Sequence, residues 1–89
     1  MNAWDEAKRQ ATLRHRGLDF ADAELVFEGR ALTLDDERRD YGEVRKITAG
    51  WLRGRFVMVV WTPRDNGRRI ISMRHSHADE EEYYREQMD

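Results

Sequence analysis

The chain has 89 residues and no cysteine, with 39% hydrophobic and 38% charged residues and a formal net charge of -2. This length suits one domain, which we expect over residues 1–89, and the lack of cysteine excludes disulfides and thiol chemistry. No apolar run approaches the roughly 18 residues that a membrane span needs. We therefore expect a cytoplasmic protein without a membrane partner.

Two helices are predicted in the first third of the chain. Asp5 begins a helical pattern that continues to residue 16, and Gly17 follows as its C-terminal cap. Asp19 can cap a shorter second helix that closes near residues 28 and 29. Five apolar side chains of this second helix are expected to face inward: Phe20, Ala23, Leu25, Val26 and Phe27.

Four strands are predicted next, at residues 31–34, 43–51, 55–62 and 68–74. The third, "RFVMVVWT", is apolar on both faces and is therefore expected to be central. The turn sequence "PRDNG" joins it to "RRIISMR" as an antiparallel pair. Ser76 and Asp79 resemble a capping box that opens a final helix over residues 77–88. The predicted fold class is α+β, with two N-terminal helices, a four-stranded mainly antiparallel sheet and a C-terminal helix.

The charges are segregated along the chain. Residues 44–78 contain eight lysines and arginines against Asp65 alone, a net charge of +7, so the remainder carries -9. Fourteen of the sixteen cations are arginine, whose planar guanidinium grips phosphate and carboxylate at two points. A biased gene composition could produce the same excess of arginine. The pattern predicts an arginine-rich surface that binds an anionic partner.

Several stretches, in their order and spacing, resemble one known family. They are "WDEAKRQATLRHRGLDFADAELVF", "RRDYGEVRKI", "RFVMVVWT" and "RRIISMR". Together they resemble the BrnT family of type II toxin–antitoxin ribonuclease toxins, from Trp4 to about Tyr83. The resemblance implies a RelE-like fold and an endoribonuclease that cleaves RNA without a metal or cofactor, so inhibiting translation and growth. It also implies a BrnA-like ribbon-helix-helix antitoxin, through which alone the toxin would reach DNA. The residues that fall on the family pattern are Lys8, Arg14, Asp19, Phe20, Arg74, Glu80 and Tyr83.

The chain departs from the family pattern at two places. The family reads Lys-His-Gly after the first helix, whereas this chain reads His15-Arg16-Gly17, which moves the imidazole by about 100° around a helix. After Arg74 the family continues with cations, whereas this chain has "HSHADEEE". The displaced histidine favours an alternative function, a non-catalytic toxin homologue that binds its antitoxin and tunes repression.

Metal-free RNA cleavage needs cations at the phosphate, a base for the 2′-hydroxyl and an acid for the leaving 5′-oxygen. Strand alternation places Ile71 and Met73 on one face and Ile70, Ser72 and Arg74 on the other, so Arg74 would leave the core as a phosphate ligand. The alternative for Arg74 is an ion pair with Glu80 or Glu81.

Other candidates fill the remaining chemical roles. His75 and His77 titrate near neutral pH and could move protons, although they could equally be solvated, or bind a metal with Asp79. Lys8 could contact phosphate, and Arg14 with His15 could either act at the site or complement the helix dipole. Glu43 is a spare base, Tyr83 would pack on the sheet or face the site, and Trp51 and Trp61 would lie in the core or at the antitoxin interface. The candidate catalytic residues are Lys8, Arg14, His15, Arg74, His75, His77, Glu80 and Tyr83.

Overall fold

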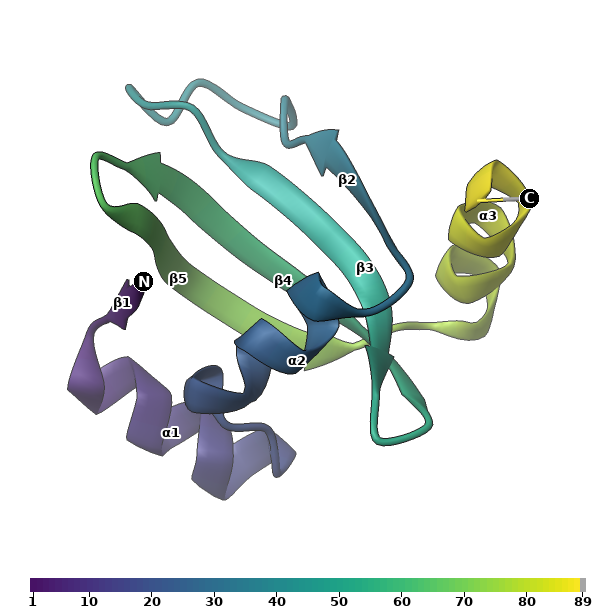
Figure 1. Cartoon of the computed structure of the whole chain (residues 1–89), viewed down its shortest axis with the longest axis horizontal. Helices are drawn as coiled ribbons and strands as arrows, with labels where there is room; N and C mark the ends of the chain where they lie inside the picture. The colour runs from purple at the N-terminus through teal and green to yellow at the C-terminus, as the bar shows by residue number, and fades with distance from the viewer. Residues whose placement is uncertain (89) are drawn as a thin grey trace.

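A five-stranded sheet in the order β1-β5-β4-β3-β2 organises the chain in the computed structural model, which describes residues 1–88 (Figure 1). The helices are α1 (Glu6–Arg16), the 3-10 turn η1 (Phe20–Asp22), α2 (Ala23–Glu28) and α3 (Ala78–Met88). The strands are β1 (Asn2–Trp4), β2 (Ala31–Asp35), β3 (Lys46–Leu52), β4 (Arg55–Arg64) and β5 (Gly67–His75). The predicted α+β class and the central position of β4 are confirmed.

The first strand was not predicted from the sequence. β1 is three residues long and pairs in parallel with β5, with Asn2 opposite Arg68 and Trp4 opposite Ile70. The other neighbouring strands are antiparallel, so the sheet is mixed. Three residues are too few to show an alternating pattern, and their pairing with a segment more than 60 positions away leaves no local signal. The predicted four-stranded sheet therefore gains a fifth strand at its edge.

Local hydrogen bonds fix both ends of α1. The Asp5 carboxylate accepts from the backbone N–H groups of Ala7 at 2.9 Å and Lys8 at 3.4 Å. At the other end Gly17 adopts φ 69° and donates to the Leu13 carbonyl at 3.0 Å, a left-handed conformation that favours glycine. Both predicted caps are confirmed.

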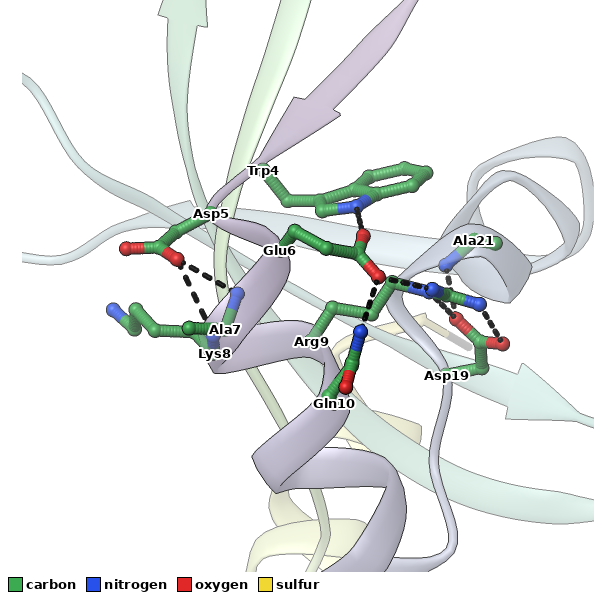
Figure 2. A network of polar contacts seen from close by, with 9 residues as sticks. All are labelled: Trp4, Asp5, Glu6, Ala7, Lys8, Arg9, Gln10, Asp19 and Ala21. Carbon is green, nitrogen blue, oxygen red and sulfur yellow. Dashed lines mark hydrogen bonds and ion pairs between the residues drawn. The ribbon is translucent and has the colours of Figure 1, made fainter.

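Arg9 joins α1 to the segment that follows it (Figure 2). Its guanidinium donates to both carboxylate oxygens of Asp19, at 2.7 and 3.1 Å, and to Glu6 at 2.6 Å. Asp19 also accepts from the Ala21 N–H at 2.9 Å and so caps η1. The predicted cap at Asp19 is therefore confirmed, although it begins a 3-10 turn that leads into α2.

The two faces of the sheet differ in what covers them. One face, which we call the covered face, packs against η1 and α2 through Phe20, Ala23 and Val26, with Met73 from β5 in the same cluster. The inward position predicted for Leu25 is wrong, because this side chain is 45% exposed. The other face, which we call the open face, holds a smaller cluster of Ala49, Phe56 and Met58 beneath Tyr84 and Met88 of α3. In Figure 1, α3 stands at the opposite end of the molecule from α1, next to β2.

A bulge in β5 decides which residues share a face. Val60 pairs with Ser72 and Trp61 with Ile70, which leaves Ile71 without a partner in the register. Directly opposite residues lie on the same face, so the bulge returns Ile70 to the covered face, where it is buried with Met73. The predicted placement of Ile70 beside Arg74 is therefore wrong. Arg74, opposite Met58, lies on the open face as predicted.

Candidate active site

Arg74 lies where the open face meets the start of α3. Its guanidinium forms a two-point ion pair with Glu80, with Nη1 to Oε1 at 2.7 Å and Nη2 to Oε2 at 2.6 Å. Both side chains are about two-thirds buried or more, with exposed fractions of 34% and 26%. The ion pair that the sequence offered as the alternative role for Arg74 is thus formed. It also fixes the guanidinium in one orientation.

Hydrogen bonds from two residues, Arg74 and His77, fix the Glu80 carboxylate. It accepts the His77 backbone N–H at 2.9 Å and so caps α3 from its third residue. The predicted capping box of Ser76 and Asp79 is wrong, because the Ser76 hydroxyl donates to the Phe56 carbonyl at 3.1 Å. Hydrogen bonds from Arg74, and secondarily from the His77 N–H, lower the pKa of Glu80 to about 2. Glu80 is therefore a fixed carboxylate that orients Arg74, and it is poorly suited to exchange protons near neutral pH.

The tyrosine at this corner is Tyr84, which the sequence reading did not select. Tyr83 is 52% exposed and touches the Tyr84 ring edge-on at 5.4 Å, so the expected packing of Tyr83 on the sheet is wrong. Tyr84 instead packs on the small cluster of the open face. Burial, and then the charge of Glu80, raise the pKa of Tyr84. The signal was available, since Tyr84 lies four residues after Glu80 and four-residue spacing brings two helical side chains together.

The two histidines are in different surroundings. The His75 Nε2 atom lies 3.3 Å from the Arg16 carbonyl, at the end of α1, and His75 pairs with Val57 of the covered face. His77 is exposed and close enough to Glu80 for its charge to act on that carboxylate. Only His77 therefore belongs to the Arg74 corner. Within residues 1–88 no group of three or more His, Cys, Asp or Glu is placed to hold a metal ion.

Lys8 and His15 line a cleft of about 360 Å³ between α1 and the edge of β5, together with Thr12 and Ser72. Ser72 lies on the open face two residues before Arg74, so the cleft and the Arg74 corner are neighbours along β5. Arg16 anchors this arrangement by donating to the Met73 carbonyl at 2.7 Å. Arg14 is exposed and does not line the cleft.

The remaining candidates have structural contacts. Trp61 donates to the Thr48 hydroxyl at 2.8 Å within the covered face, and Trp51 packs edge-on against Phe56 at 4.8 Å. Both tryptophans are partly buried and pack against the buried clusters, Trp61 on the covered face and Trp51 on the open face, which agrees with the expected core position only in part. Glu43 precedes β3, which begins at Lys46 rather than at residue 43, and lies 3.5 Å from both Arg45 and Arg64. These ion pairs leave Glu43 a poor candidate for a free base.

A loop after β2 contributes a cluster that the sequence reading missed. The Asp36 side chain is fully buried, and Arg38 contacts both of its oxygens, Nε at 2.7 Å and Nη2 at 2.8 Å. The Tyr41 hydroxyl donates to the same carboxylate at 3.2 Å. Hydrogen bonds from Arg38 lower the pKa of Asp36 to about 2. The loop follows β2, the strand that contacts α3. The pKa of Arg74 is raised chiefly by Glu80, and the charge of Arg38 opposes this rise.

Ion pairs neutralise much of the predicted cationic surface. Six of the eight cations in residues 44–78 have a carboxylate partner from outside that segment. The six pairs are Arg45–Glu43, Lys46–Asp35, Arg53–Asp22, Arg64–Glu43, Arg68–Glu24 and Arg74–Glu80. The fold therefore pairs the cations of this segment with carboxylates from the rest of the chain. The binding of an anionic partner then depends on local groups of exposed cations more than on the net charge of the segment.

Comparison with known proteins identifies the family to which the chain belongs. No helix in the described part of the chain has the length and apolar character needed to cross a membrane. No curated protein sequence matches the chain. Residues 4–80 match the family described as "Ribonuclease toxin, BrnT, of type II toxin-antitoxin system". The match covers the helices of the covered face, strands β2 to β5 and the Arg74–Glu80 pair, and it begins at the last residue of β1. The chain therefore belongs to the BrnT family and is an endoribonuclease toxin of a type II system, with RNA as its substrate and an antitoxin as its partner.

Proposed function

We propose that this toxin cleaves RNA without a metal ion, with the scissile phosphate bound by Arg74 on the open face. The observation that supports this site is the two-point Arg74–Glu80 pair, which holds a partly exposed guanidinium in a fixed orientation beside Tyr84 and His77. A guanidinium fixed before the substrate binds can stabilise charge that builds on a phosphate without reorganising.

The neighbouring groups supply the other steps. The His77 imidazole takes or gives a proton, because it is exposed at the Arg74 corner and an imidazole can act as either acid or base. The Tyr84 hydroxyl, which is protonated near neutral pH as an ordinary tyrosine is, donates a hydrogen bond to the phosphate. Lys8 and His15 bind the adjacent nucleotide in the cleft along β5. Glu80 positions Arg74, while Arg14, His75 and Tyr83 have no direct part in the reaction.

The antitoxin is proposed to be a BrnA-like ribbon-helix-helix protein that covers the open face. That face has a partly exposed apolar strip, Ile47 and Val60, and Arg74 lies on the same face of β5, which suits a segment that buries an apolar side chain beside a cation. The toxin then contacts DNA only through this partner. In this account residues 1–89 act as one domain in the cytoplasm, and cleavage of RNA stops translation and growth.

The second candidate function is a non-catalytic toxin homologue that binds the antitoxin and tunes repression. Two observations favour it: Glu80 already occupies both terminal nitrogens of Arg74, and His15 lies in the β5 cleft with no contact to that pair. In that case the open face would serve the antitoxin alone.

Product analysis separates these functions and tests the metal requirement. The purified protein is incubated with end-labelled single-stranded RNA and excess EDTA. Attack by the 2′-hydroxyl predicts cleavage that leaves a 2′,3′-cyclic phosphate and a 5′-hydroxyl. Activity that is lost with EDTA and restored by zinc, with 5′-phosphate products, would contradict the proposal. Antitoxin binding without cleavage under any condition would support the second function.

A further inference from the structure

The Asp36–Arg38 pair is a buried charge with an exposed partner. The Asp36 carboxylate has no exposed side-chain surface, whereas the Arg38 side chain is 63% exposed. Burying an ionised carboxylate is costly unless it is paired and fully hydrogen-bonded. Asp36 meets this condition with two nitrogens of Arg38, the Arg38 backbone N–H at 3.3 Å and the Tyr41 hydroxyl.

This pairing orients Arg38 toward solvent. Nε and Nη2 are directed at Asp36, while most of the Arg38 side chain stays exposed. A guanidinium can bind a carboxylate along one edge and still present donors to a phosphate along the other.

The loop that carries Arg38 follows β2, the strand that contacts α3 and so lies near the Arg74–Glu80 pair. The positive charge of Arg38 acts on Arg74 and on the Tyr84 hydroxyl, opposing the rise of both pKa values. Each arginine therefore has its own two-point carboxylate partner, Asp36 in the loop and Glu80 in α3. Two arginines that are held near each other by separate carboxylates can bind the same polyanion.

We propose that Arg38 is a second RNA-binding residue, oriented by Asp36, which contacts a phosphate next to the one held by Arg74. The inference rests on the proposed function, because it takes the open face as the RNA site. Arg38 and Arg74 then hold successive phosphates of a single strand, and Asp36 is a positioning residue.

A first test uses the unmodified protein. Arginines are labelled with phenylglyoxal and located by mass spectrometry, with and without a 2′-O-methyl RNA oligonucleotide that cannot be cleaved. RNA is expected to protect both Arg38 and Arg74. Arg39 is the internal control, because it is exposed in the same loop and lines an acidic cavity with Asp35, Asp36 and Asp40. Equal labelling of Arg38 with and without RNA would overturn the inference.

A second test measures affinity for the same oligonucleotide. Arg38→Gln is expected to weaken binding about tenfold, as for the loss of one charged hydrogen bond, and to lower the salt slope by about 0.7, as for one single-strand phosphate. Arg39→Gln makes the same charge change and should leave affinity within about twofold. Asp36→Asn keeps the charge of Arg38, so it should weaken binding while preserving the salt slope.

The double variant Asp36→Asn/Arg38→Gln is the control for folding, because it leaves no unpaired buried charge. It should bind RNA like Arg38→Gln alone. Wild-type affinity in this folded double variant would overturn the inference. If Arg74 is protected by RNA and Arg38 is not, only the inference fails. If neither arginine is protected although the protein cleaves RNA, the proposed site itself is wrong.

Discussion

At the scale of single residues, His75 and His77 differ in what surrounds them although only Ser76 separates them in the chain. The sequence alone gave no reason to prefer either imidazole. The structure places His75 against the Arg16 carbonyl and His77 beside Glu80. The end of β5 at His75 accounts for this difference, because strand alternation no longer relates the two residues after the strand stops.

The first prediction follows from this difference. His77→Ala is expected to lower kcat/KM for RNA cleavage by roughly 10²-fold, the contribution of one proton-transfer group. His75→Ala is the matched control and should retain activity within a few-fold. Cleavage rates of both variants, measured beside circular dichroism spectra, test the assignment. A larger loss of activity in His75→Ala than in His77→Ala would contradict the assignment and indicate that the proton is transferred near α1.

The second prediction concerns acid stability. The pKa values of Asp36 and Glu80 fall from their ordinary 3.8 and 4.5 to about 2 in the folded chain. Both carboxylates therefore stabilise the fold above pH 4.5, and this stabilisation is lost as the pH falls from about 4.5 to about 2. Each contributes on the order of 2 kcal/mol at neutral pH.

Urea unfolding between pH 2 and pH 6 measures this loss. Asp36→Asn and Glu80→Gln should each flatten the decline in the free energy of unfolding. Glu37→Gln is the control, because Glu37 is exposed and has no ion pair among the described residues. An unchanged acid profile in both test variants would show that neither pair is formed in solution.

At the scale of elements, the sequence predicted what depends on neighbouring residues. The Asp5 and Gly17 caps and the two apolar faces of β4 are local patterns, and each is found where it was expected. The missing pieces depend on distant pairing. β1 forms only because β5 offers it a parallel edge, and the bulge at Ile71 follows from the β4–β5 register. The Asp36–Arg38 pair was missed for a related reason, since nothing local marks a loop carboxylate as buried.

The third prediction tests the link between α1 and η1. Asp19→Ala removes the η1 cap and both hydrogen bonds from Arg9, so the free energy of unfolding should fall by at least about 1 kcal/mol and Tm by roughly 5 °C. Asp79→Ala is the matched control, because Asp79 stands in the first turn of α3 with an exposed side chain. Thermal melts of both variants decide the point. Equal Tm values would mean that the link adds nothing to stability.

At the scale of the whole molecule, ion pairs bring together the two charge-segregated parts of the sequence. The net +7 of residues 44–78 predicted a broad cationic surface, yet only two of its eight cations, Arg55 and Arg69, lack an ion pair within residues 1–88. We therefore expect RNA and antitoxin to be recognised at a few fixed arginines. Both ligands are expected to need the open face.

The fourth prediction is that the antitoxin and RNA compete. Adding antitoxin should displace the 2′-O-methyl oligonucleotide from the toxin in a fluorescence titration, and hydrogen exchange should be slowed in β4 and β5 of the complex. Protection confined to the acidic residues 79–88, with RNA still bound, would contradict a shared open face.

The central claim is that Arg74 binds the scissile phosphate, and its most direct test is single-turnover cleavage of one RNA by the Arg74→Gln variant. Arg85→Gln is the matched control, because Arg85 also pairs with a glutamate of α3 but is 58% exposed. We expect Arg74→Gln to cleave roughly 10²- to 10³-fold more slowly, the loss typical of one transition-state donor, while its circular dichroism spectrum stays native and Arg85→Gln remains fully active. A folded Arg74→Gln variant that cleaves at the wild-type rate would contradict the claim.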